Sequence, residues 1–185
     1  QDKQEFQIGD FGQVGGNTRI TNAGAATVKG IELEVTAQPT EGLALDASLG
    51  WQDAEYDEFL TEDPTRAALG VLNLAGNKLS RAPEWKIHIG AQYEWQLDGN
   101  LGSLLARADY AWVDEQFWRA FNLDTDAGDS YGRTNARLRW LSLDQSWSAE
   151  AYVLNLEGDD VISNESLGSG DFGFAHFANY LPPRT

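Results

Sequence analysis

The sequence lacks cysteine, is poor in basic residues and contains no long apolar run. Without cysteine, disulfides and thiolate metal sites are excluded, and the redox compartment stays undecided. There are 13 Lys and Arg residues against 29 Asp and Glu, and the formal net charge of −16 argues against nucleic acid as a partner. No stretch of about 18 apolar residues is present, so we expect no transmembrane helix; strands that span a membrane alternate, and they stay compatible with the low hydropathy.

Recognisable catalytic motifs are also missing. The sequence has no Gly-x-Ser-x-Gly, no His-Glu-x-x-His and no phosphate-binding loop. Its two histidines, His88 and His176, lie far apart in the sequence, so only the fold could pair them at a metal. The segment DTDAGD (124–129) offers oxygen ligands but lacks the glycine and the terminal glutamate of a calcium loop. We therefore expect no enzyme, no metal site and no cofactor.

The sequence does contain strict alternation of apolar and polar residues. From Trp85 to Leu97, in RAPEWKIHIGAQYEWQL (81–97), every odd position is apolar and every even position is polar or glycine. A period of two predicts a strand with one apolar and one polar face, here about 13 residues long. The same pattern predicts strands at 29–38, 43–51, 104–113, 133–142 and 147–156, a half strand near Gln4–Ile8 and a last strand that starts near Tyr180. A helical turn is possible only at 67–76.

The connections between these strands alternate in length. Tight turns are predicted at PTEG (39–42), DGN (98–100) and LDQS (143–146), because these residues accept turn dihedral angles. The other connections are long, at 57–82, 119–131 and 157–179, and long loops often carry function. Short turns at one end and long loops at the other are typical of outer-membrane barrels. A soluble up-and-down barrel or sandwich also alternates and is the structural alternative.

Tryptophan lies near both ends of the predicted strands. If strand 85–97 tilts by about 45°, Trp85 and Trp95 are separated along a membrane normal by roughly 23 Å, close to the apolar band of roughly 25 Å between aromatic girdles. Four more tryptophans lie on apolar faces near strand ends: Trp51, Trp112, Trp140 and Trp147. In a soluble core each indole N–H would need a partner, whereas at a lipid interface it meets headgroups.

The opposite faces carry charges of both signs. They are Glu32, Glu34, Asp46, Lys86, His88, Glu94, Arg107, Asp109, Arg137, Arg139 and Glu150. Small barrels fill their interior with packed side chains, so this many charges favours a wide, wet or plugged lumen. A solvated sheet face is the simpler interpretation of any one row.

Four segments carry a family resemblance. In NAGAATVKGIELEVTAQPTEGLALDASLGWQDAEYDEF (22–59), Asn-Ala-Gly precedes Gly-Ile-Glu-Leu-Glu, a turn, and a strand that ends in aspartate and tyrosine. GNKLSRAPEWKIHIGAQYEW (76–95) contains Gly-x-x-Leu-x-x-Ala-Pro, and AYVLNLEGDD (151–160) and LPPRT (181–185) follow. Together and in this order, these segments resemble the barrels of TonB-dependent outer-membrane receptors.

The resemblance implies an all-β fold, namely an antiparallel transmembrane β-barrel segment with short periplasmic turns and long extracellular loops. Residues 1–185 would form the C-terminal portion of a 22-stranded barrel, with the plug domain and the final strand absent; an eight-stranded barrel is the alternative. The implied function is uptake of a scarce nutrient, such as an iron–siderophore complex, across the bacterial outer membrane. Implied partners are the TonB complex through the missing plug region, outer-membrane lipid and lipopolysaccharide, and a small-molecule nutrient. The alternative function is a soluble carbohydrate-binding module that uses exposed aromatic residues.

Strand parity also predicts a ligand-contact region. Strand 85–97 would run inward from one long loop, and strand 101–118 would run outward to the next. Five residues then lie near the outer ends of their strands with inward side chains, where a polar or charged ligand would meet them: Lys86, His88, Glu115, Arg119 and Arg133. The alternative role for each is to hydrate or brace the barrel wall.

Overall fold

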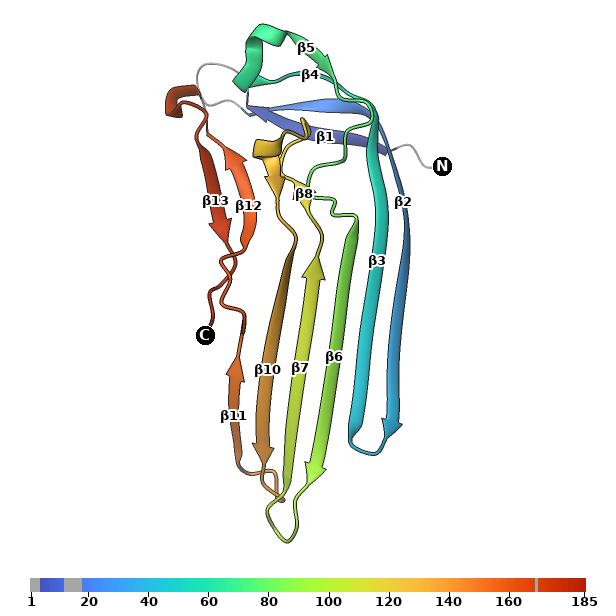
Figure 1. The fold of residues 1–185 in the computed structure, drawn as a ribbon, viewed down its shortest axis with the longest axis vertical. Coiled ribbons are helices and arrows are strands. Elements are labelled where there is room, and N and C mark those ends of the chain that lie inside the picture. Colours follow the sequence, from blue (N-terminus) through green and yellow to red (C-terminus); the bar gives the residue numbers. More distant parts are fainter. Residues whose placement is uncertain (1–3, 12–17, 169) are drawn as a thin grey trace.

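The structure, a computed structural model, describes residues 4–11, 18–168 and 170–185. Its main feature is a seven-stranded antiparallel sheet in the order β1-β2-β3-β6-β7-β10-β11, in which each strand pairs with the strands next to it in this order (Figure 1). The strands are β1 (Gln4–Phe11), β2 (Thr18–Thr40), β3 (Leu43–Glu58), β6 (Trp85–Gln96), β7 (Ser103–Val113), β10 (Tyr131–Leu141) and β11 (Ser148–Val153). Tight turns join the strands at one end, here called the short-turn end, and longer segments join them at the other, the long-loop end.

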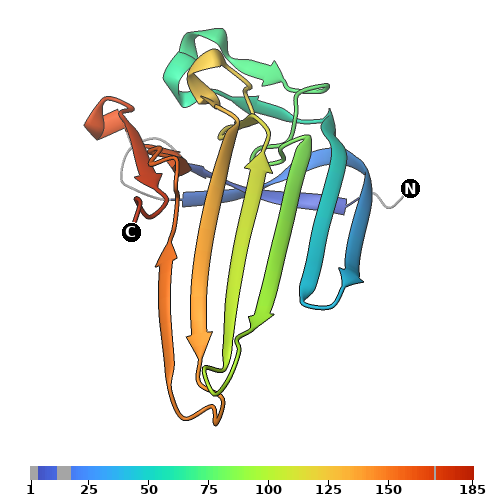
Figure 2. The same cartoon turned by 60° about the horizontal axis from the view of Figure 1, so that its bottom comes forward.

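The long connections contain short elements of their own. The three small antiparallel pairs are β4 (Leu60–Glu62) with β5 (Val71–Asn73), β8 (Gln116–Phe117) with β9 (Ala127–Gly128), and β12 (Ile162–Leu167) with β13 (His176–Tyr180). In the described part of the chain, three 3-10 helices accompany them: η1 (Pro64–Leu69), η2 (Asp124–Asp126) and η3 (Gly170–Phe172). Figure 2 shows these elements gathered at the long-loop end of the sheet. No helix among the described residues is long and apolar enough to cross a membrane.

The register of the sheet keeps one face apolar, as the alternation predicts. Across β3, β6 and β7, Ala47 pairs with Ile89 and Ile89 pairs with Tyr110. The apolar side chains on this face are solvent-exposed rather than packed into a core; Ile31 is 68% exposed and Ile89 is 52% exposed. This exposure does not support the alternative of a soluble sandwich, in which one face of the sheet would be covered.

Aromatic side chains border the apolar face at both ends. At the long-loop end Trp51 pairs with Trp85, and their ring centroids are 6.3 Å apart. At the short-turn end Trp95 and Trp140 both pair with Leu104. Two of these indoles donate to protein groups, because Nε1 of Trp51 bonds to a carboxylate oxygen of Glu84 at 3.2 Å and Nε1 of Trp140 bonds to the carbonyl oxygen of Leu101 at 2.7 Å. The expectation that the indole N–H groups meet headgroups is therefore wrong for Trp51 and Trp140, whose N–H groups donate to protein acceptors.

The buried apolar cluster lies at the long-loop end, not against the sheet centre. Ala26 of β2 pairs with Tyr56 of β3, and both pack with Phe59 and Leu74. Leu72, Leu79, Ala120 and Phe121 pack around this cluster. The described part of the chain therefore places its core where the long segments fold onto the ends of β2 and β3.

Several element boundaries differ from those predicted. β2 has 23 residues, starting at Thr18, and β3 continues to Glu58, because both strands extend past the apolar face into the buried cluster. β11 is shorter than predicted, and the helical turn expected at 67–76 is a 3-10 helix at Pro64–Leu69 followed by β5. The half strand near Gln4–Ile8 is confirmed as β1. A last strand that starts near Tyr180 is wrong: β13 ends at Tyr180 and forms a hairpin with β12.

Candidate functional site

The register arranges the polar side chains of neighbouring strands in rows across the second face of the sheet. The row nearest the long loops contains Gly50, Lys86 and Val113, and the next contains Ser48, His88, Ala111 and Arg133. A third row contains Asp46, Gly90, Asp109 and Asn135. Three of the five predicted site residues, Lys86, His88 and Arg133, are thus brought onto one face within two adjacent rows. Ala111 separates His88 from Arg133 in their row.

Arg107 of β7 is the centre of the most connected group on this face. Its Nη1 and Nη2 donate to the two carboxylate oxygens of Asp46 at 2.9 and 3.2 Å. Its Nε donates to Asp109 at 3.1 Å, and its Nη2 donates to the same carboxylate. Arg107 and Asp109 share a strand face because they are two residues apart, whereas only the sheet register brings Asp46 near. The paired, planar geometry fixes the guanidinium across three strands.

His88 lies beside this group. Its Nδ1 is 3.5 Å from a carboxylate oxygen of Asp46, and its Nε2 is 3.6 Å from one of Asp109. These three residues offer donor atoms within 4.8 Å of one another, which is the spacing of a metal site. The guanidinium of Arg107 already donates to both carboxylates, however, and supplies the positive charge that a cation would supply. The arrangement is therefore a hydrogen-bonded brace in the sheet rather than an open ligand set.

Gly90 makes room for the brace. A Cβ atom at this position would lie 2.4 Å from Oδ2 of Asp46 and 2.6 Å from Nη2 of Arg107. Both distances are far below van der Waals contact, so any larger residue would push the ion pair apart. The glycine in the polar row of β6 is thus explained by the close approach of two side chains from neighbouring strands.

Lys86 and Arg133 differ in how far they are committed to other groups. Lys86 is exposed, and no polar partner of its ammonium group is recorded among the described residues. Nη2 of Arg133 donates to the carbonyl oxygen of Pro182 at 3.1 Å, while its Nε is buried with no acceptor in the described structure. Lys86 is therefore the predicted site residue whose charge is most accessible on this face.

The prediction that Glu115 and Arg119 lie at the outer end of a strand over 101–118 is wrong, because β7 ends at Val113 and both residues lie in the segment that connects β7 to β10. Glu115 is exposed between β7 and β8. Arg119 is only 15% exposed and contacts two carboxylates that are 0% exposed, with 2.8 Å to Asp63 and 3.2 Å to Asp126. The structure therefore commits the Arg119 guanidinium to buried acidic groups from two different long segments.

Asp63 is held in its charged form by this arrangement. Burial raises the pKa of its carboxyl, but hydrogen bonds from Thr65, Arg66 and Arg119 outweigh burial and lower the pKa to about 2. The sequence context explains the local geometry: Asp63 precedes Pro64 and caps η1, accepting from the backbone N–H of Thr65 at 3.0 Å. Acidic N-caps followed by proline are favourable helix starts.

Sequence reasoning placed Asp46, Arg107 and Asp109 on the polar face but did not single them out. The available signals were the Arg-x-Asp spacing on one strand and a glycine, Gly90, among polar residues on the next. Asp126 belongs to the DTDAGD segment (124–129), which offers oxygen ligands in the sequence, whereas Asp63 is not among the predicted site residues. Asp63 could have been found from the Asp-Pro-Thr capping pattern, whereas only the folded long segments bring Asp126 near Arg119.

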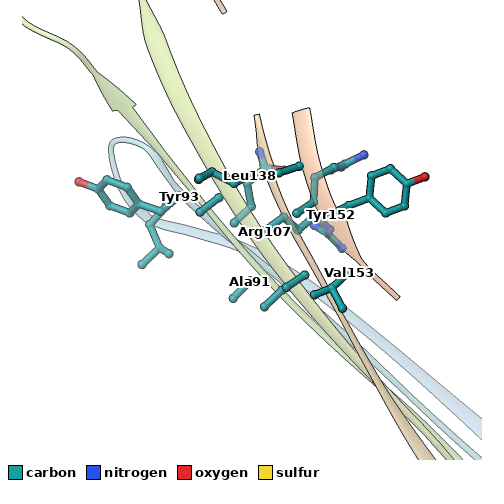
Figure 3. Close-up of a pocket in the computed structure, with 13 residues that line it drawn as sticks. Ala91, Tyr93, Arg107, Leu138, Tyr152 and Val153 are labelled. Carbon is teal, nitrogen blue, oxygen red and sulfur yellow. The ribbon is translucent and has the colours of Figure 1, made fainter. Parts of the chain in front are cut away.

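An open groove of about 600 Å³ lies on the sheet across β6, β7, β10 and β11 (Figure 3). Small or apolar side chains dominate its lining, including Ala91, Ala106, Ala108, Ala136 and Leu138. In the close-up the rings of Tyr93 and Tyr152 point in opposite directions, in keeping with their positions on opposite faces of the sheet. The groove belongs to the apolar face and offers little to a polar ligand.

The architecture is that of a portion of an outer-membrane-type barrel: consecutive antiparallel strands, one exposed apolar face bordered by tryptophan, one charged face, and long segments at one end. Comparison with known families agrees, because the family described as "TonB dependent receptor-like, beta-barrel" matches residues 1–156 of the chain. The chain belongs to this family. Members of the family are transporters rather than enzymes, and their barrels reside in the bacterial outer membrane.

Solved structures show the same fold. The chain is similar to the ferric yersiniabactin uptake receptor FyuA from Yersinia pestis, with a TM-score of 0.69 and 19% identity over 90% of this chain and 23% of that one. It is also similar to the siderophore receptor PiuA from Acinetobacter baumannii, with a TM-score of 0.67 and 16% identity over 98% of this chain and 23% of that one. The copper transporter OprC gives a TM-score of 0.61 and 22% identity, over 98% of this chain and 26% of that one. The chain thus spans about a quarter of the length of these structures.

Proposed function

We propose that the chain is the C-terminal portion of the barrel wall of a receptor that takes up a scarce nutrient with TonB-derived energy. The observation that carries this proposal is the family match over residues 1–156, on a sheet with one lipid-compatible face and one charged face. Of the similar structures, FyuA is named as a ferric yersiniabactin uptake receptor, PiuA as a siderophore receptor and OprC as a copper transporter. They support a chelated or free metal ion as the nutrient class, with an iron–siderophore complex as the first candidate.

The partners follow from the two faces. The exposed apolar face, with residues such as Ile31 and Ile89, would contact outer-membrane lipid and lipopolysaccharide. The charged face would line the lumen, where the small-molecule nutrient passes. Contact with the TonB complex would occur through a plug region outside this sequence. The long-loop end would face the cell exterior, and the turns at 98–100 and 143–146 would face the periplasm.

The proposed nutrient contacts are Lys86, His88, Glu115, Arg119 and Arg133. Lys86 is the strongest of them, because its side chain is exposed on the charged face and has no recorded polar partner there. An unpaired ammonium group suits an anionic chelate, since it adds attraction without first breaking an ion pair. Arg119 would need to leave two buried carboxylates before it could contact a ligand.

Energised uptake by the full-length receptor tests the proposal. A strain from which the receptor is deleted would be complemented with wild-type receptor, and accumulation of ⁵⁵Fe from hydroxamate and catecholate chelates and of ⁶⁴Cu²⁺ would be measured with and without TonB. We expect at least one probe to accumulate only when both receptor and TonB are present. If no probe depends on either, the proposed nutrient class is wrong.

A matched pair of variants tests the contact residue. Lys86→Gln removes an unpaired charge from the lumen face, whereas Lys78→Gln removes a charge that pairs with Glu84 at 3.3 Å in the long-loop region. We expect Lys86→Gln to weaken binding of the transported chelate by about five- to tenfold, and Lys78→Gln to leave it nearly unchanged. Equal affinities for wild type and Lys86→Gln, with barrels folded, would exclude Lys86 from the contact surface.

A further inference from the structure

Two long segments at the same end of the sheet contact each other extensively. The first, residues 59–84, connects β3 to β6, and the second, residues 114–130, connects β7 to β10. We infer that these segments form one cooperative folded unit, here called the two-segment cap, with Arg119 as its central residue, so that they open and close together rather than as separate loops.

The ion pairs at the centre of the cap join residues of both segments. Asp63 belongs to the first segment, Asp126 to the second, and both are 0% exposed. Arg119 contacts both carboxylates through different guanidinium nitrogens. A buried carboxylate that loses its cationic partner is strongly destabilised. Separating the segments would take Arg119 from Asp63, which would keep Arg66 of its own segment at 2.7 Å, and would open the buried contact of Arg119 with Asp126, so the loss would be felt in both segments.

An aromatic ring joins the charged centre to the apolar cluster. Phe121 of the second segment lies beneath two guanidinium groups, with its ring centroid 4.8 Å from Cζ of Arg119 and 5.9 Å from Cζ of Arg66. Phe121 also packs against the buried cluster that contains Phe59 and Leu74 of the first segment. The ion-pair centre and the core of the cap are thus one continuous packed structure.

The backbones of the two segments also satisfy each other's hydrogen bonds. The side chain of Asn122 accepts from the backbone N–H of Lys78 at 2.6 Å and donates to the carbonyl oxygen of Lys78 at 3.1 Å. Asn77 returns the contact by donating from its side chain to the carbonyl oxygen of Ala120 at 2.8 Å. The backbone N–H of Arg81 donates to the carbonyl oxygen of Phe117 at 2.8 Å. Opening one segment alone would leave several of these groups unpaired in both.

Amide hydrogen exchange of the full-length receptor in detergent micelles distinguishes a cooperative cap from two neighbouring loops. Arg119→Met changes the second segment only, and Asp63→Asn changes the first segment only. For a cooperative cap, each variant speeds exchange by about tenfold or more in peptides from both segments, while peptides from β6 and β7 stay unchanged. Heat-modifiable mobility on gels confirms that the barrel is folded.

The control acts on the same carboxylate from within one segment. Thr65→Val removes the hydroxyl that donates to Oδ1 of Asp63 at 2.7 Å and keeps the contact with Arg119. We expect this variant to speed exchange much less than Arg119→Met and Asp63→Asn do. If Arg119→Met does not fold, Arg119→Lys serves instead, because it replaces the guanidinium that contacts both Asp63 and Asp126 with a single ammonium group. Faster exchange confined to the segment that carries the substitution, for either Arg119 or Asp63, would overturn the cooperative cap.

Discussion

Two adjacent residues of β3 offer a direct test of which face of the sheet meets lipid. Ala47 lies in a row with Val35 and Ile89, which are 50% and 52% exposed, and the side chain of the next residue, Ser48, points to the other face, between Glu34 and His88. Both residues are small, share one strand and differ in depth by only one residue. Replacing each by arginine therefore adds the same positive charge and a side chain of the same size, once to each face of the sheet.

The expected difference follows from depth. Ala47 is four residues from Trp51 and four from Leu43, which pairs with Tyr93. At about 3.3 Å per residue and a tilt of about 45°, this places Ala47 about 9 Å from each aromatic row, near the middle of the apolar band. Arginine on the lipid face near the midplane costs about 2 to 4 kcal/mol. Ser48→Arg should cost less than about 1 kcal/mol, because its charge enters a hydrated lumen opposite Glu34.

Urea titration of the full-length receptor refolded into lipid vesicles measures both costs. The cost of about 2 to 4 kcal/mol for Ala47→Arg corresponds to a roughly 30- to 900-fold change in the folding equilibrium, whereas the cost for Ser48→Arg corresponds to less than about sixfold. The control is the wild-type receptor, with folding followed by gel mobility. Equal costs for Ala47→Arg and Ser48→Arg, or a larger cost for Ser48→Arg, would refute the assignment of the faces.

Three further predictions concern the two ends of the sheet and the brace on its charged face. An impermeant thiol reagent on intact cells should label Leu69→Cys at the long-loop end and not Leu143→Cys at the short-turn end, although these leucines are similarly exposed at 57% and 62%; labelling of Leu143→Cys alone would reverse the topology. The folded cap lowers the pKa of Asp63 from 3.8 to about 2, and this shift stabilises the cap by about 2 kcal/mol above pH 4. The stabilisation is lost as the pH falls towards 2 and Asp63 is protonated in the folded cap. Pepsin should therefore cut the 59–84 segment of Asp63→Asn faster than that of wild type at pH 4 and equally fast near pH 2, and a constant ratio would contradict this. Gly90→Ala should destabilise the barrel by about 1 kcal/mol in urea titration, because the side-chain ends of Asp46 and Arg107 must shift to admit the new methyl group. Gly50→Ala, whose Cβ meets nothing within 4 Å, should have little effect, and equal effects would contradict the close approach at Gly90.

The strands across the apolar band could be predicted from the sequence because alternation reports directly on a two-faced sheet. Trp85 to Gln96 follows the pattern without a break; the strand begins with the pattern and ends one residue before Leu97, where the pattern ends. The alternation did not predict the full length of β2 and β3 at their long-loop ends. β2 and β3 continue beyond the band into the cluster around Ala26 and Tyr56, and there the contacts come from other long segments rather than from one side of the sheet.

The candidate site was predictable only as far as strand parity reaches. Parity placed Lys86, His88 and Arg133 on one face, and the register confirms this placement. It could not identify the brace around Arg107, because Asp46 is distant in sequence and only the pairing of three strands brings it near. Parity named Arg119 as a ligand contact but could not predict its burial against Asp63 and Asp126, because those contacts depend on how two irregular segments fold together.

Accessibility of spin labels along β6 tests the central claim, that this chain is the wall of a membrane barrel, most directly. Single cysteines would be introduced from Lys86 to Glu94, without Gly90, in the full-length receptor in lipid vesicles, and each label would be exposed to oxygen and to a water-soluble nickel chelate. Oxygen accessibility should be highest at the odd positions from Ile87 to Tyr93, and nickel accessibility should be highest at the even ones, because the two agents report lipid and water on opposite faces. Maxima of both agents at the same positions, or no period of two, would contradict a strand that separates lipid from an aqueous lumen.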